Sequence, residues 1–584
     1  MKTEKKNRTE RLEFFSALYE NARNAYAEEL SLMERHMRQY RGSLELDGAK
    51  ESATTVRNIT YELIESQISS DIPQPKCDPA IYSEKRCRSA HAVETLCRSL
   101  RDALPFEELN DLDERYTYIY GGSIWFVEWD AKSKCRGEMG GVKVHCLSPR
   151  DFIPQPGVSS VEDMEYCFLR LTTTAGELSR KYGIRDEDIP LADFEYEAEV
   201  GGEFDTVSVV LAFYKDEAGD VCRYDFSGDL VLLDMEKYYK RKTRFCKRCS
   251  HTAAECTCER PLLHHVDIDE EEISDKERGV SLRVPYYMPS GFPFVIRKNT
   301  SIEGCLLGQS DCEYIRPEQQ AINKIESRIL QKLLRAGITP IVPEDASITL
   351  NNSVFGQLIK MKPGESAAQY GKVDTTPDIS QDIAEAERLY DHSKRIVGIS
   401  DAYQGIDSAS NESGVARRLR ISQASGRLES KRMMKHTAYS YLDRKIFEHY
   451  LAFSDEVRLL SYKDAFGRVH NAAFNRYDFI EYDPDTETFR YDDAYLFSVD
   501  QNGGADYQRD ALWERNLENL KAGTLGDPMR ISTLLRYWQC QERAHYPHAR
   551  ENVEYFTELL KKGDDIGAEG KDTQAFGKEP TENV

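Results

Sequence analysis

The sequence lacks long hydrophobic runs. Nowhere do about eighteen apolar residues follow one another, which excludes a membrane-spanning helix of ordinary length. The basic start, Met1 to Arg8, has no apolar segment behind it, so we expect no signal peptide. Charged residues make up 31% of the chain and hydrophobic residues 40%. These features predict a soluble protein that is made in a cytosol and folds its 584 residues into several domains.

Common enzyme motifs are missing as well. No GxxxxGK[ST] sequence is present, which excludes a Walker-type phosphate loop, and neither HExxH nor GxSxG occurs. His392, His436 and His449 fall on expected helices, without acidic or cysteine partners at ligand spacing. No internal repeat is found. We therefore predict a protein that has no enzymatic active site.

Positive charge is scarce relative to negative charge. The chain has 78 Lys and Arg against 101 Asp and Glu, a formal net charge of −23. A protein that grips duplex DNA over a broad face is usually basic, so this balance argues against such a face. Two interpretations stay open: a surface along which DNA slides without sticking, and the ordinary acidity of a soluble protein.

Four of the 14 cysteines are closely spaced. A CxxC pair is followed by a CxC pair: Cys246, Cys249, Cys256 and Cys258. Four thiolates in two close pairs can surround a tetrahedral Zn²⁺, and a site closed by four thiolates is structural rather than catalytic. The CxC spacing departs from the common zinc ribbon, so reduced surface cysteines in a loop are the alternative. In a chain without a secretory signal, disulfides are not expected.

A helical hairpin with a β unit at its end is predicted in the middle of the chain. From Pro317 to Ala336, apolar residues recur at helical spacing, with Pro317 in the first turn. Short strands broken at Asn351-Asn352 and Pro363-Gly364 follow, and the helical period returns from Asp378 to Val397. The first helix carries an apolar stripe and a basic row, which are Ile322, Ile325, Ile329 and Leu333, and Lys324, Arg328 and Lys332.

A glycine-, serine- and aspartate-rich segment, 399–413, separates this hairpin from a long helix predicted from Gly414 to Phe453. The long helix has many more basic than acidic residues, among them Lys431, Lys435 and Arg444. Such an excess favours an anionic partner. Either DNA phosphate or the acidic face of a neighbouring subunit would fit.

Short polar motifs open two of these helices. Gly308-Gln309-Ser310-Asp311, then Gln319-Gln320, Asn323 and Ser327, precede or occupy the first helix, and Ser413-Gly414-Val415-Ala416 opens the long one. In their order, these motifs and elements resemble the portal proteins of tailed bacteriophages. The resemblance implies an α+β, multidomain portal fold with a mixed α/β wing, a helical stem hairpin, a small β-containing clip and a helical crown.

The resemblance also divides the chain. It implies a wing with a cysteine-rich zinc-knuckle insertion, a first stem helix, a clip, a second stem helix, a tunnel loop, a long helix with the return to the wing, crown helices and a disordered tail. Their respective residues are 1–307 (insertion 237–265), 308–336, 337–377, 378–398, 399–413, 414–500, 501–562 and 563–584.

By the same resemblance, the protein would be a structural portal at one capsid vertex of the virion, assembled in the host cytoplasm as a ring of twelve subunits. Double-stranded DNA would pass through the ring during packaging and ejection. Implied partners are the terminase large subunit, the major capsid and scaffolding proteins, and a head-completion or adaptor protein. The alternative from another class is a zinc-dependent nucleic-acid-processing enzyme or regulator, supported by the cysteines and the basic runs.

The residues expected near the DNA carry both signs of charge. Asp401, Asp407 and Glu412 would bring negative charge close to the phosphates and discourage tight binding. The basic row Lys324, Arg328 and Lys332 could supply a weak, screened attraction that centres the duplex. Pairing of this row with acidic residues of the neighbouring stem helix, such as Glu385 and Glu387, is the structural alternative.

Overall fold

The computed structural model describes most of the chain. The described residues are 8–43, 55–135, 138–185, 206–235, 237–246, 263–267, 270–275, 280–335, 338–341, 351–353, 356–358, 371–374, 377–399, 414–463, 469–483, 488–500, 506–543, 546 and 549–566. Within them, no helix combines enough length with enough apolarity to cross a bilayer.

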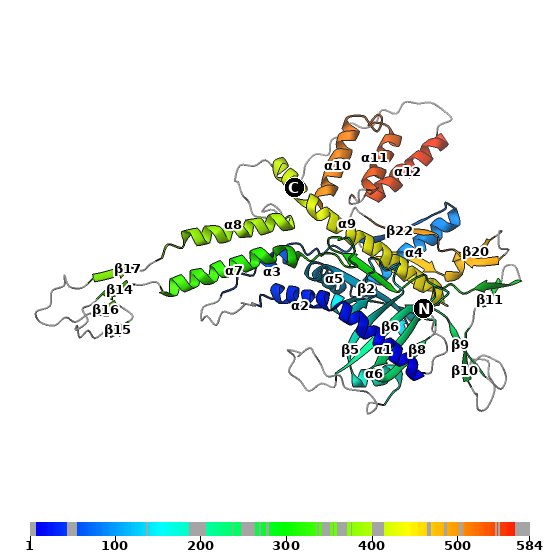
Figure 1. The fold of residues 1–584 in the computed structure, drawn as a ribbon. Helices are drawn as coiled ribbons and strands as arrows, with labels where there is room; N and C mark the ends of the chain where they lie inside the picture. Colours follow the sequence, from blue (N-terminus) through cyan, green and yellow to red (C-terminus); the bar gives the residue numbers. More distant parts are fainter. Residues whose placement is uncertain are drawn as a thin grey trace, which may run out of the picture.

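An antiparallel five-stranded sheet forms the outer part of the body (Figure 1). Successive residues of its strands point to opposite faces, and both faces are apolar, so each face needs a cover. Helix α1 (Arg8–Ala25) packs its Phe15, Tyr19 and Ala22 against one face. Helix α6 (Ala175–Tyr182) lies on the other. The strands, in spatial order, are β4 (Phe152–Pro154), β5 (Tyr166–Thr174), β6 (Thr206–Lys215), β7 (Val221–Ser227) and β8 (Leu230–Met235).

A three-stranded sheet divides the body into two cores. In β2 (Gly122–Cys135), Ile124 and Phe126 join the core under the five-stranded sheet, whereas Trp125 and Val127 join the core formed with the long helix. The alternation of side chains along one strand therefore ties the two cores together. The elements around the second core are β3 (Glu138–Leu147), β13 (Phe294–Lys298), α4 (Glu84–Ala103), α5 (Phe106–Tyr120) and α9 (Gly414–Phe453).

Two-stranded antiparallel pairs complete the body. Strands β1 (Gln74–Pro79) and β22 (Tyr495–Asp500) pair across most of the sequence and pack beside α4 and α9. The other pairs are β9 (Lys242–Cys246) with β10 (Leu263–Asp267), β11 (Glu270–Asp275) with β12 (Val280–Pro285), β18 (Arg458–Lys463) with β19 (Val469–Phe474), and β20 (Ile480–Asp483) with β21 (Thr488–Tyr491).

Helices α7 (Asp311–Arg335) and α8 (Ser380–Val397) run side by side away from the body (Figure 1). A small β unit lies at their far end. At the near end, α2 (Ala27–Tyr40) and α3 (Ile59–Glu65) brace α7. We call the pair α7–α8 the stem hairpin. The β unit pairs β14 (Ile338–Ile341) with β17 (Gly371–Asp374) and β15 (Asn351–Ser353) with β16 (Gly356–Leu358).

Three helices form a separate layer next to α9, on the side away from the five-stranded sheet (Figure 1). Helix α11 packs between its two neighbours, and Gln541 on α11 donates a hydrogen bond to the carbonyl of Trp513 on α10. These helices are α10 (Asp506–Lys521), α11 (Ile531–Arg543) and α12 (Ala549–Ile566).

The α+β, multidomain fold class is confirmed, and three predicted boundaries are wrong. Helix α7 begins at Asp311, because the Ser310 hydroxyl accepts a hydrogen bond from the Cys312 N–H and caps the helix, so Pro317 lies inside it. Asn351 and Asn352, predicted as a turn, pair in β15. Helix α12 continues to Ile566, so the first four residues of the predicted tail are helical. The rest of the tail, 567–584, lies outside the described residues.

Candidate functional site

Two backbone segments approach closely, each at a glycine, where the stem hairpin leaves the body. The N–H of Gly308 donates to the carbonyl of Gly121, at 2.9 Å, and a Cβ built on Gly121 would lie 2.1 Å from the Gly308 carbonyl oxygen. Gly121 ends α5 with φ +92°, a conformation that favours glycine. A Cβ built on Gly308 would lie 2.5 Å from the Thr300 carbonyl oxygen, so close backbone packing also requires glycine at the first residue of the Gly308–Asp311 motif.

Asp311 anchors the first turn of α7 in the body. Its carboxylate, in a residue only 2% exposed, accepts hydrogen bonds from Lys431 Nζ at 2.6 Å, Gln67 Nε2 at 2.9 Å and Asn299 Nδ2 at 2.8 Å. Lys431 also lies over the Tyr118 ring, 5.0 Å from its centroid. One buried charge pair with amide donors thus joins α7 to the long helix and the central sheet.

A second buried ionic group lies behind the first. Arg297 Nη1 is 2.5 Å from Asp113 Oδ2 and 2.7 Å from Glu114 Oε1, and Lys435 of α9 also contacts Glu114, at 3.0 Å. Burial alone would raise the pKa of Glu114, but the charges of Arg297 and Lys435 more than offset it and hold that pKa below its usual value. The group binds α5, β13 and α9 together.

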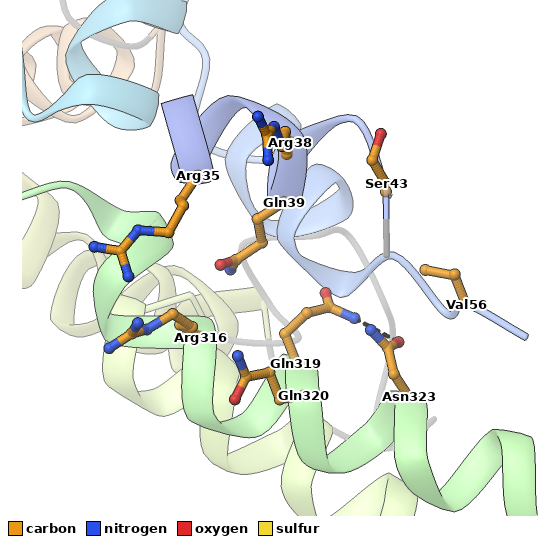
Figure 2. Close-up of a pocket in the computed structure, with 10 residues that line it drawn as sticks. Arg35, Arg38, Gln39, Ser43, Val56, Arg316, Gln319, Gln320 and Asn323 are labelled. Carbon is orange, nitrogen blue, oxygen red and sulfur yellow. Dashed lines mark hydrogen bonds between the residues drawn. The ribbon is translucent and has the colours of Figure 1, made fainter. Parts of the chain in front are cut away.

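The amide-rich middle of α7 is fixed to α3. Gln319 accepts hydrogen bonds from the backbone N–H and the hydroxyl of Thr60, both at 3.0 Å, and donates to Asn323 Oδ1 at 2.9 Å (Figure 2). Farther along, Ser327 accepts a hydrogen bond from the Thr55 N–H at 3.3 Å. Gln319, Asn323 and Ser327 are buried. The polar residues of the motif therefore satisfy backbone and hydroxyl groups at the stem base.

A histidine and an arginine bind the same carboxylate beside this contact. His36 Nε2 of α2 is 3.2 Å from Glu313 Oε2 of α7, and Arg316 binds the other oxygen of Glu313 at 2.8 Å. Burial lowers the pKa of His36 more than its hydrogen bond to Glu313 raises it, so the imidazole is neutral near pH 7.

A cavity of about 250 Å³ opens between α2 and α7 (Figure 2). Its lining includes three arginines, Arg35, Arg38 and Arg316, together with Gln39, Gln319 and Gln320. Arg38 binds Glu34 at 2.7 Å, and Arg316 binds Glu313. Arg35 makes no ion pair or hydrogen bond with any other described residue. We call this cavity the arginine pocket.

The predicted apolar stripe divides along the length of the hairpin. Ile322 is fully buried against Leu63, Tyr390 and Val397, Ile329 is buried, and Ile325 is half-buried. Three large apolar side chains nearer the β unit are exposed: Leu333 at 49%, Leu334 at 68% and Ile383 at 46%. The stripe therefore packs within the chain near the body and stays uncovered toward the β unit.

The predicted basic row divides in the opposite sense, because its two residues nearer the β unit are paired and the one nearer the body is not. Arg328 and Lys332 both donate to the carboxylate of Asp382 on α8, and neither contacts Glu385 or Glu387, which bind Arg388 and Arg57. Lys324 is exposed and has no ion pair in the described part of the chain. Asp401, Asp407 and Glu412, the other predicted channel residues, lie outside the described residues.

Three lysines in the described part of the long helix pair with carboxylates of the same chain. Lys431 binds Asp311, Lys435 binds Glu114, and Lys445 binds Glu448 at 2.9 Å. For these side chains, the sequence predicted an anionic partner in DNA or in a neighbouring subunit. The structure instead shows carboxylates of the same chain as their partners. Side chains of the first two turns of α9 and beyond, up to residue 427, are not described.

Of the four predicted zinc ligands, the structure describes only the backbone of Cys246. Cys246 ends β9, opposite Leu263 of β10, and Cys249, Cys256 and Cys258 lie between these two strands in the sequence. Those three lie in the part that is not described. Elsewhere in the described chain, no cluster of three His, Cys, Asp or Glu side chains has metal-binding geometry.

Sequence reasoning missed the buried ionic residues Asp113, Glu114 and Arg297. A signal existed, because Asn110, Asp113 and Thr117 recur at helical spacing on a face of α5 that is buried. A polar stripe on a buried helix face indicates buried partners, although it does not identify them.

No model of a known protein family matches the sequence, and no curated protein matches it. The chemical character of the site must therefore be judged from its geometry. Its buried charged groups pair with each other, its buried amides bind side-chain and backbone groups, and together they fix a projecting hairpin to a body.

Proposed function

We propose that this protein is a structural portal subunit that forms a ring-shaped DNA channel at one capsid vertex. The observation that carries the proposal is the stem hairpin, which is locked to the body by buried polar groups and bears a β unit at its far end (Figure 1). In the proposed ring of twelve subunits, the hairpins run along the channel axis. The protein acts as a conduit and docking platform, without catalysis of its own.

The uncovered apolar side chains of the hairpin support assembly. Leu333, Leu334 and Ile383 expose between 46% and 68% of their surface in the single chain. Burying a large aliphatic side chain contributes roughly 1.5–3 kcal/mol, so contact between neighbouring hairpins would stabilise a ring.

The two ends of the molecule suit different partners. The β unit, at the tip of the hairpin, would dock the terminase large subunit during packaging and a head-completion or adaptor protein afterwards. The body, with its five-stranded sheet, would face the major capsid and scaffolding proteins. The assembled ring belongs to the virion, and the subunits are made in the host cytoplasm.

Double-stranded DNA passing through the ring would meet few free cations. Arg328 and Lys332 are neutralised by Asp382, which leaves Lys324 as the residue of the predicted row that has no ion pair among the described residues. Asp401, Asp407 and Glu412 would add negative charge in the tunnel loop. A channel of this kind attracts the duplex weakly and allows it to slide.

The cysteine cluster would hold one structural Zn²⁺ through Cys246, Cys249, Cys256 and Cys258. Four thiolates leave no open coordination position, so the ion would staple the loop between β9 and β10. Elemental analysis of the purified protein should give one zinc per chain, with all four thiols protected from alkylation. Absence of zinc together with free alkylation would refute this part of the proposal.

The mass of the purified protein in solution tests the function. Size exclusion with light scattering should give a closed ring of many copies, and the protein should not cut DNA in the presence of Zn²⁺. A monomer or dimer with metal-dependent nuclease activity would instead favour the zinc-dependent nucleic-acid-processing enzyme.

A further inference from the structure

Among the residues that the structure describes, the arginine pocket carries a cation, Arg35, that no carboxylate neutralises. It contains three guanidinium groups, and two carboxylates, Glu34 and Glu313, bind one guanidinium each. Arg35 is left without an ion pair or hydrogen bond to any residue that the structure describes. Figure 2 shows Arg35 and Arg316 at the same side of the view, beside Gln39, Gln319 and Gln320. One additional carboxylate would balance the charge.

A matching carboxylate is present on the other helix of the stem hairpin. Helix α8 has four acidic residues. Asp382 binds Arg328 and Lys332, Glu385 binds Arg388, and Glu387 binds Arg57. The fourth, Asp391, is exposed and makes no ion pair or hydrogen bond among the described residues.

Asp391 lies at the same level of the hairpin as the arginine pocket. His392 Nδ1 is 3.1 Å from Glu318 Oε1, which places this turn of α8 beside the turn of α7 that lines the pocket. Residues from α8 of the same chain do not line the pocket. In a ring with rotational symmetry, equivalent residues of all subunits lie at the same position along the channel axis. Asp391 of a neighbouring copy would therefore lie level with the pocket.

We propose that the arginine pocket binds the Asp391 carboxylate of a second copy of this chain, as a latch between neighbouring stem hairpins. The inference rests on the proposed ring. Its chemistry is a charge-assisted contact between a carboxylate and guanidinium groups, for which arginine has suitable geometry.

A nucleic-acid phosphate fits the pocket less well. A polyanion would have to approach a chain of net charge −23 and pass Glu34 and Glu313, which already occupy Arg38 and Arg316. A single carboxylate on a side chain meets less repulsion and can enter a recess between two helices.

A charge swap tests the latch. Arg35→Glu and Asp391→Lys should each raise the concentration at which half the chains are in rings by about tenfold or more, because each places like charges together. The double variant, with both charges exchanged, should restore assembly of the wild type. Arg388→Glu, which makes the same charge change on α8 outside the pocket, is the control and should leave assembly near that of the wild type.

Each other outcome has a distinct meaning. Assembly of both single variants at the wild-type concentration would refute the latch, and so would a double variant that assembles no better than the single ones. Both results would leave the proposed function standing. A lower Tm of the unassembled Arg35→Glu chain would place the partner of Arg35 within its own chain. Intact rings that lose duplex-DNA binding would make the pocket a phosphate site. A wild type that forms no ring would remove the proposed function itself.

Discussion

At its base the stem hairpin is held by buried polar groups, whereas its far end exposes large apolar side chains. Asp311 at the base is 2% exposed and accepts hydrogen bonds from three side chains. At the far end, Arg328, whose side chain is 57% exposed, shares Asp382 with Lys332, and Leu333 and Ile383 face solvent. The difference separates two tasks: the base fixes the direction of the hairpin, and the far end is available for contacts with other chains.

The largest effect is expected from Asp311→Asn at the base. The change leaves Lys431 buried without a counter-charge, and breaking a buried ion pair costs about 3–5 kcal/mol. Backbone amides of α7 should then exchange with deuterium about 100-fold faster, as expected for a local loss near 3 kcal/mol. The control is Glu303→Gln, at an exposed position just before α7. Unchanged exchange in α7 would contradict the role of Asp311.

Shortening an apolar side chain should act differently at the two ends. Ile322→Ala at the base creates a cavity and should lower the free energy of unfolding by about 2–4 kcal/mol. Leu333→Ala should leave the unassembled chain nearly as stable as the wild type and weaken ring formation. Urea unfolding of the unassembled chain and light scattering of the ring measure the two effects. Equal losses of chain stability would remove the distinction between base and far end.

A pH dependence is expected at the base through His36. Because burial lowers its pKa in the folded chain, the unfolded chain binds more protons once the pH falls below about 6.5, and folding stability declines as the pH drops. Protection of α2 and α7 from amide exchange should fall as the pH drops below about 6.5. His36→Gln should flatten this dependence. An unchanged slope in the variant would show that other groups cause it.

The smallest effect is expected from Asp382→Asn at the far end. Its cationic partners, Arg328 and Lys332, are partly exposed and can be solvated when the ion pair is lost. The change should therefore alter the free energy of unfolding very little. The Tm of the unassembled chain should stay within measurement error of the wild type. A loss as large as that of Asp311→Asn would mean that the far end is as tightly held as the base.

Periodicity was sufficient to predict the stem hairpin and the long helix. Apolar spacing over many turns specifies a helix, and the predicted bounds of α9, Gly414 and Phe453, are those observed. Short strands were harder, because pairing with a partner overrides local turn propensity at Asn351 and Asn352.

The partners in the site could not be predicted from local pattern. Lys431 and Asp311 are separated by 120 residues, and Arg297 and Asp113 by 184. Nothing in the spacing of either residue selects the other. The sequence therefore identified a basic excess on the long helix and the polar motif at the start of α7, but did not show that they bind each other.

Imaging single particles of the purified wild-type protein tests the central claim most directly. The account predicts ring-shaped particles of closed rotational symmetry with an open centre, and one stem hairpin per subunit projecting from the same side of the ring. Particles of single-chain size, or assemblies without a central opening, would contradict it.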